Sequence, residues 1–105
     1  MIIKTSRYNY LSKVQLKQKA VKTGAANIVI AAVFSRTEKK YGRRGKRFVF
    51  MEAGHVAQNV YLQAISLDLA TVSIGGFQSA QVKQALGVLQ DDEEPLYILP
   101  IGKVL

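Results

Sequence analysis

The chain has 105 residues, carries a formal net charge of +8 and contains no cysteine. This length fits one small domain or part of a larger one, and its 49% hydrophobic content is enough to bury a core. The composition excludes disulfides, thiolate metal sites and a cysteine nucleophile. Because no apolar run is long enough for a membrane span and no secretory signal is recognisable, we expect a cytoplasmic protein.

The first third of the chain predicts a helix followed by a buried strand. Residues 11–24 place apolar side chains among lysines and end at a glycine, a pattern typical of an amphipathic helix with a lysine-rich outer face. The run NIVIAAVF, residues 27–34, is apolar and β-branched without polar alternation. We therefore expect a strand that is covered on both faces.

A short helix and a basic loop are expected next. Ser35 lies three residues before Glu38, which is the spacing of a capping box, and this predicts a short helix that ends at Gly42. The following RRGKR, residues 43–47, predicts a basic surface loop.

The longest helical pattern runs from Phe48 to about Leu69. Its apolar positions fall on one stripe, which consists of Val49, Ala53, Val56, Ala57, Val60, Ala64 and Leu67 and is widened by Tyr61 and Ile65. A helix that is apolar over so much of its circumference is expected to be central and largely buried.

The last third predicts a strand, a helix and a final strand. ATVSIGGF, residues 70–77, is a β-rich run that ends in two glycines, and Ser79 is expected to cap a short helix that ends near Gly87. The segment 89–95 predicts an acidic surface loop. Residues 96–102 predict the last strand, in which Pro100 indicates an edge position or a bend.

Few residues suggest catalysis by side chains. His55, the single histidine, would share a helix face with Glu52 and Asn59, but a histidine packed in a helix–helix interface is the interpretation we favour. No second metal ligand stands at ligand spacing, and neither a nucleophile elbow nor a nucleotide-binding glycine motif is present. We expect no metal site.

Gly75 and Gly76 allow two interpretations. They either form a tight turn with positive φ, or let bare backbone N–H groups approach a flat ligand or an anion.

The charge distribution leaves a second function open. Residues 1–47 contain thirteen lysines and arginines against one acid, while residues 48–105 contain two against six. Such asymmetry suits a polyanion-binding surface or an oligomer with complementary faces. Because no nucleic-acid-binding motif is present, we treat nucleic acid as the less favoured partner.

Four segments in order resemble the nitroreductase family of flavoproteins, and most closely its SagB-type dehydrogenases. The segments are YGxRGxRF, EAGHVAQNVYLQA, SIGGF and EPLYILPIG, and the similarity extends over about residues 11–103. The resemblance implies an α+β fold in which helices flank an antiparallel-type sheet. It also implies that the long helix packs against its twin in a homodimer.

The resemblance further implies FMN at the dimer interface. Ile74, Gly75 and Gly76 would bring backbone amides beside the isoalloxazine ring, and Lys103 would approach the phosphate. The flavin would then transfer hydride between NAD(P)H or a peptide azoline and an acceptor.

The match covers only the C-terminal half of such a domain. The chain, 1–105, is thus expected to be a single domain that is incomplete on its N-terminal side, without the family's arginine-rich phosphate site. Three functions remain open: a flavin oxidoreductase, a non-catalytic oligomeric module that has lost flavin, and a basic polyanion-binding protein.

Overall fold

A computed structural model describes residues 2–6, 26–87, 89–90 and 92–103. Its elements are β1 (Ile2–Ser6), β2 (Ala26–Ala32), α2 (Phe34–Tyr41), a 3-10 turn (Gly42–Arg44), α3 (Gly45–Ser66), β3 (Leu69–Thr71), α4 (Ser79–Leu86) and β4 (Glu94–Lys103). The helix expected over residues 11–24 lies outside the described residues. Within them, no helix has the length and apolar character needed to cross a membrane.

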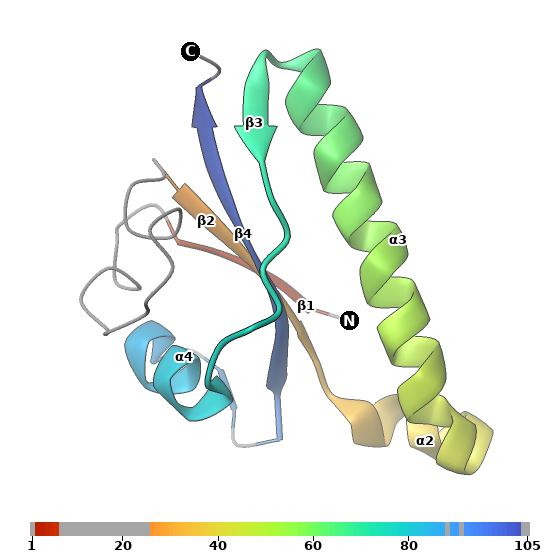
Figure 1. Cartoon of the computed structure of the whole chain (residues 1–105). Coiled ribbons are helices and arrows are strands. Elements are labelled where there is room, and N and C mark those ends of the chain that lie inside the picture. The colour runs from red at the N-terminus through yellow and green to blue at the C-terminus, as the bar shows by residue number, and fades with distance from the viewer. Residues whose placement is uncertain (1, 7–25, 88, 91, 104–105) are drawn as a thin grey trace.

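The strands form one antiparallel sheet in the order β1-β2-β4-β3. The long helix α3 covers one face, and α4 packs on the other (Figure 1). This architecture confirms the expected α+β fold with an antiparallel sheet and a long helix.

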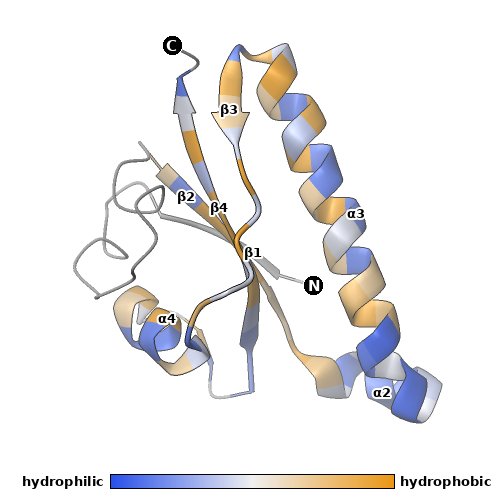
Figure 2. Cartoon of the chain, viewed as in Figure 1, coloured by the Kyte–Doolittle hydropathy of each residue, from blue (hydrophilic) through white to orange (hydrophobic). Residues whose placement is uncertain are grey.

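Alternate residues of the central strands supply two cores, one on each face. Val29 and Ile98 pack with Val82 of α4, whereas Ile30 and Leu99 pack with Ala53 and Ala57 of α3. The middle parts of the central strands are therefore apolar, while Asn27 in β2 and the two ends of β4 are hydrophilic, as the hydropathy colouring shows (Figure 2). The prediction of a doubly covered strand at residues 27–34 is confirmed for β2, although Phe34 already begins α2.

Several helix details differ from the expectation. The N-caps of α2 and α4 are Val33 and Gln78, and neither makes a side-chain capping bond, so the predicted Ser35 capping box and Ser79 cap are wrong. The basic segment 43–47 is helical, since it forms the 3-10 turn and the first turn of α3. Helix α3 consequently begins and ends about three residues before the predicted bounds.

The expected burial of α3 is confirmed on one stripe only. Val49, Ala53, Ala57 and Ala64 are buried, and Ala53 and Ala57 pack against the sheet. The opposite side exposes several large apolar side chains, including Met51, Leu62 and Ile65, and Leu67 lies exposed just beyond the helix.

Pro100 is not at an edge, because β4 lies between β2 and β3. Thr71 pairs with Ile101 and Ile74 pairs with Ile98, so one register continues through the interruption between these two pairs. In that register Pro100 lies opposite Val72, where its missing N–H breaks the ladder. The proline therefore interrupts β3 without ending the sheet.

The acidic segment before β4 is less exposed than expected. Glu93 is buried, and its Oε1 accepts a hydrogen bond from the Gln90 N–H at 3.3 Å. Glu94 begins β4 and forms a salt bridge with Lys83 of α4 at 2.9 Å. A surface loop was thus the wrong prediction for these two acids.

Candidate functional site

The segment 73–77, which follows β3, is fixed at two points. The N–H of Ile74 donates to the Ile98 carbonyl at 2.8 Å, and the N–H of Ile98 donates back to Ile74 at 2.9 Å. The Ser73 N–H donates to the phenolic oxygen of Tyr61 at 2.6 Å, and the Tyr61 hydroxyl donates to Ser73 Oγ at 3.1 Å. The sheet and α3 together therefore set the position of the two glycines that follow.

Neither glycine is required by the backbone of this protomer. Among the described residues positive φ occurs at Gly42, Asp68 and Gly87, but not at Gly75 or Gly76, so the interpretation as a positive-φ turn is wrong. A Cβ on Gly76 would meet no atom within 4 Å, and one on Gly75 would make ordinary contact with the Tyr97 ring at 3.6 Å. The absence of side chains leaves open space at Gly76.

The N–H groups of the two glycines are available as donors. Both residues are exposed, and nowhere in the described part of the chain does a hydrogen bond use either N–H. The Gly75 carbonyl accepts from the Phe77 N–H at 3.2 Å, which turns the chain toward α4. Bare amides on a fixed segment suit a flat or anionic ligand that must approach the backbone closely.

The four expected cofactor residues do not all lie together. Ile74, Gly75 and Gly76 are consecutive on the segment, and Ile74 faces the core on the α4 side. Lys103 is the last residue of β4. It lies five residues beyond Ile98, the partner of Ile74, and this separation is about 17 Å along a strand. Lys103 is exposed there and pairs through its backbone with Leu69.

His55 lies on the exposed side of α3, away from the sheet. No hydrogen bond in the described region joins it to Glu52 or Asn59. The described residues also contain no group of three acids or histidines that would hold a metal ion. The protomer therefore presents backbone amides, and not an acid–base pair, as its chemically useful groups.

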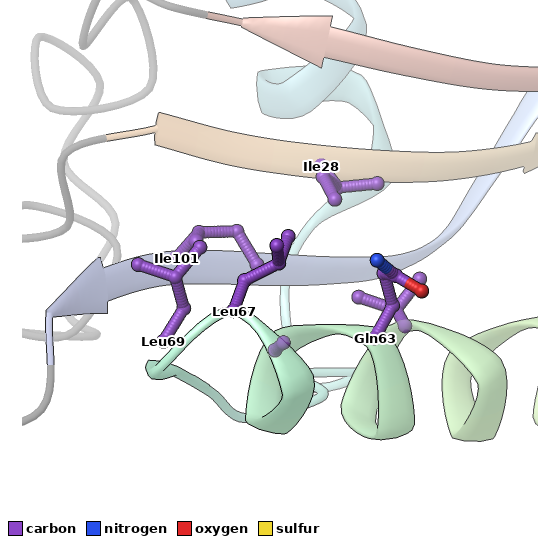
Figure 3. Close-up of a pocket in the computed structure, with 7 residues that line it drawn as sticks. Ile28, Gln63, Leu67, Leu69 and Ile101 are labelled. Carbon is purple, nitrogen blue, oxygen red and sulfur yellow. The ribbon is translucent and has the colours of Figure 1, made fainter.

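An apolar hollow of about 180 Å³ lies at the C-terminal end of α3 (Figure 3). Seven residues line it: Ile28, Val60, Gln63, Ala64, Leu67, Leu69 and Ile101. Of these only Gln63 has a polar side chain. The hollow offers apolar contact without a group for proton transfer, and it is near the Lys103 end of β4.

Sequence reasoning missed both the Tyr61–Ser73 contact and this hollow. Tyr61 was assigned to the apolar stripe, although a tyrosine on a buried stripe needs a partner for its hydroxyl. Leu69 was taken as the end of the helix, but it begins β3 and lines the hollow.

The described residues fit an FMN ring better than an FMN phosphate. Gly75 and Gly76 offer free amides on a fixed segment, whereas the candidate phosphate ligand Lys103 lies at the far end of β4. The ring contact can therefore be argued from this chain alone, and the phosphate contact cannot.

Comparisons with known proteins agree on one family. The model described as the Nitroreductase family matches residues 3–103. A Methanocaldococcus jannaschii protein assigned as a nitroreductase is 44% identical over 93 residues, which is 89% of this chain and 46% of that protein. The chain thus spans about half the length of this curated relative.

Solved structures show the same fold. A nitroreductase-assigned protein of Anabaena variabilis is 35% identical, with a TM-score of 0.80 over 90% of this chain and 19% of its own. A Staphylococcus epidermidis protein assigned as an NAD(P)H:FMN oxidoreductase is 16% identical, with a TM-score of 0.73 over 97% of this chain and 65% of its own.

Proposed function

Because the chain belongs to the nitroreductase family, we propose that it supplies one half of the flavin site of a cytoplasmic FMN-dependent oxidoreductase. The enzyme would be of the SagB type, and NAD(P)H or a peptide azoline would be the hydride donor. The name of the S. epidermidis neighbour contains FMN and NAD(P)H, which supports this cofactor and the first of these two donors.

The observation that carries the proposal is the pair of glycines that the protomer itself does not need. Gly76 has neither positive φ nor a neighbour that would exclude a side chain. Its unpaired N–H lies beside that of Gly75, on a segment fixed by Ile74 and Ser73. A ligand that packs directly on the backbone explains the glycines, since any side chain would occupy its place.

Bound FMN would supply the hydride chemistry, and this chain would supply position and electrostatics. The amides of Gly75 and Gly76 would donate to the ring edge on which negative charge develops during reduction. Such preorganised donors stabilise a developing anion without reorganising. The Tyr97 ring behind Gly75 would keep the segment from retreating, because it occupies the space on that side.

Lys103 is proposed as a phosphate ligand in the same enzyme, from a position remote from the glycines. A lysine ammonium acts on phosphate as a flexible point charge and does not require the fixed geometry of a guanidinium. Its side chain is free to reach such a group, since no ion pair of the described residues includes it.

We further propose that the protein is a homodimer that packs through the outer side of α3. Leu62 and Ile65 are 57% and 70% exposed on this side, and between residues 53 and 66 no Lys, Arg, Asp or Glu occurs. Gly54 lies about two and three turns before them on the same side, and a Cβ there would meet nothing within 4 Å. The bare backbone at Gly54 would let a second α3 approach closely.

Flavin binding by glycine variants tests the function. We expect the purified protein to take up FMN, with flavin absorbance and quenched flavin fluorescence. Gly76→Val should weaken FMN binding at least about tenfold by filling the space beside the ring, or about 1.4 kcal/mol. Gly102→Val is the matched control, because a Cβ there also meets no atom within 4 Å.

Equal FMN affinity in both variants would contradict the assigned ring contact. A protein that stays colourless and gives no heat on FMN titration would instead support the alternative, a non-catalytic oligomeric module. That alternative retains the α3 dimer and predicts no functional effect of Gly76→Val.

A further inference from the structure

A dense group of cations occupies the corner where α2 meets α3. Seven exposed lysines and arginines occur within twelve residues: Arg36, Lys39, Lys40, Arg43, Arg44, Lys46 and Arg47. We call this group the basic corner. It lies at one end of the molecule and forms a strongly hydrophilic region in the hydropathy view (Figure 2).

The corner is a fixed surface of two packed helices. A Cβ on Gly45 would come within 2.9 Å of the Glu38 backbone, so α3 begins in direct contact with α2. Edge-to-face aromatic pairs hold the two helices together, with ring centroids 5.6 Å apart for Phe34–Phe50 and 5.1 Å apart for Tyr41–Phe48. The backbone positions that carry the cations are therefore fixed relative to one another.

The fold gains little from these charges. Lysines at the end of α2 suit its helix dipole, but Lys46 and Arg47 lie in the first turn of α3, where cations oppose it. Each pair of like charges one turn apart, such as Arg43 and Arg47, destabilises the fold by about 0.2–0.5 kcal/mol. Within the described residues no acid pairs with any of the seven. An external anion would remove this repulsion.

Aromatic rings lie exposed among the cations. Tyr41 is 48% and Phe48 36% exposed, and Lys40 Nζ lies 5.2 Å from the centroid of the Tyr41 ring. The two rings line an open hollow of about 290 Å³ together with Thr37 and Glu52. The hollow thus combines ring surfaces with a hydroxyl and a carboxylate.

We propose that the basic corner binds single-stranded nucleic acid. Phosphates would contact the lysines and arginines, and a base would enter the hollow to stack on Tyr41 or Phe48. The Glu52 carboxylate would accept a hydrogen bond from a base amino group. The same carboxylate disfavours an anionic membrane as the partner, and a ring in a hollow needs an unstacked base, which a duplex does not offer. This site is independent of the flavin.

Fluorescence anisotropy with labelled oligo-C and oligo-dC of about 20 nucleotides tests the proposal, since cytosine carries the amino group that Glu52 would contact and single-strand sites are of this order or shorter. We expect binding at low salt that weakens as salt is raised. Neutralising Arg43, Arg44, Lys46 and Arg47 together as glutamines should reduce the slope of log K against log salt by about 3, or roughly 0.7 for each phosphate contact. The variant should melt at the same or a higher temperature, because it loses like-charge repulsion.

Single variants separate the corner from net charge. Arg44→Gln should weaken binding several-fold, while Gln84→Glu lowers the net charge by the same amount on an exposed position of α4 and should leave binding within twofold, as an order-of-magnitude expectation for one phosphate contact. Tyr41→Leu should weaken binding about tenfold without changing the salt slope, because stacking is not ionic.

Three results would overturn the proposal. They are no binding at low salt, equal losses for Arg44→Gln and Gln84→Glu, and tighter binding to vesicles of equimolar phosphatidylcholine and phosphatidylserine than to either oligonucleotide. The last result would identify an anionic lipid surface as the partner instead.

Discussion

Tyr61 joins the long helix to the segment beyond β3 through a single phenolic oxygen. That oxygen accepts from the Ser73 N–H at 2.6 Å and its hydroxyl donates to Ser73 Oγ at 3.1 Å. The Ile74–Ile98 pair holds the neighbouring residue to the sheet. Tyr61 is therefore a positioning residue for the glycines, although it does not belong to their segment.

Removing this hydroxyl has two expected effects. Tyr61→Phe leaves the Ser73 N–H without its partner and should lower the free energy of unfolding by about 1–2 kcal/mol in urea titrations. It should also speed hydrogen exchange of the Ser73 and Ile74 amides, and weaken FMN binding if the ring contacts that segment.

Tyr41→Phe is the matched control for Tyr61→Phe. No hydrogen bond in the described part of the chain uses the Tyr41 hydroxyl, so its removal should change stability by less than about 0.5 kcal/mol. Equal stability losses in the two variants would show that the Ser73 contact does not hold the segment.

At the scale of elements, Pro100 explains why β3 is short. The register of β3 continues to the Ile74–Ile98 pair, but the residue opposite Val72 is Pro100, which has no N–H to donate. In the Ile74–Ile98 pair, the N–H of each residue points toward the other strand. Hydrogen-bonded pairs recur at every second residue of an antiparallel ladder, so an N–H at position 100 would also point toward Val72. The proline thus leaves Val72 and Ser73 outside the regular strand.

Pro100→Val should extend the ladder. The new amide at position 100 should donate to the Val72 carbonyl and exchange at least about tenfold more slowly than an exposed amide, as measured by NMR. The Ile98 amide serves as the protected reference and the Gly76 amide as the exposed one. The free energy of unfolding should change by less than about 1 kcal/mol. The new hydrogen bond stabilises the fold, whereas the loss of proline gives the unfolded chain more conformational freedom, and the two effects offset each other.

If the amide of Pro100→Val exchanged as fast as that of Gly76, the interruption would have another cause. In that case Val72 would be held away from β4 by the Tyr61–Ser73 contact and not by the missing donor.

The periodic elements were predictable from the sequence, and the ends and partners were not. The continuous β-branched run at 27–34 indicates a doubly covered strand, and the helical stripe along α3 indicates both the element type and the buried face. Strand order depends on pairing between distant segments, so the sequence left Pro100 at an edge or at a bend, and the edge alternative is wrong. Caps failed because Ser35 and Ser79 lie inside their helices and make no capping bond.

The candidate site was predictable only where a short motif carries it. Gly75 and Gly76 stand out because paired glycines after a strand are rare without a turn or a ligand. The Tyr61–Ser73 contact joins residues twelve positions apart through a side chain, and no periodic pattern contains that information. The positive-φ interpretation of these glycines is wrong. A glycine that is needed for a turn and a glycine that leaves space for a ligand look alike in the sequence, and only the backbone geometry distinguishes them.

For the whole molecule, the proposed dimer rests on the outer side of α3. Gly54→Leu should convert the proposed dimer to a monomer in size-exclusion chromatography with light scattering, because a large side chain would prevent close approach of two helices. The fold should persist in circular dichroism, since a Cβ at this position has open space.

Gln84→Leu is the control for Gly54→Leu, because it adds the same side chain on an exposed position of α4. It should not change the mass of the particle. A wild-type protein that is monomeric at high concentration, or a Gly54→Leu variant that remains dimeric, would contradict the proposed interface.

The sheet order has a consequence for how the chain reaches its fold. The two central strands, β2 and β4, pair Ile30 with Tyr97, which are 67 positions apart (97 − 30). Almost the whole described chain must therefore be present before the middle of the sheet can close, and such long loops slow folding. On the ribosome the apolar β2 must wait, unpaired with β4, until the last strand has emerged. The hydrogen bonds within helix α3 are local, so we expect this helix to form before that late closure and to offer its apolar stripe to the closing sheet.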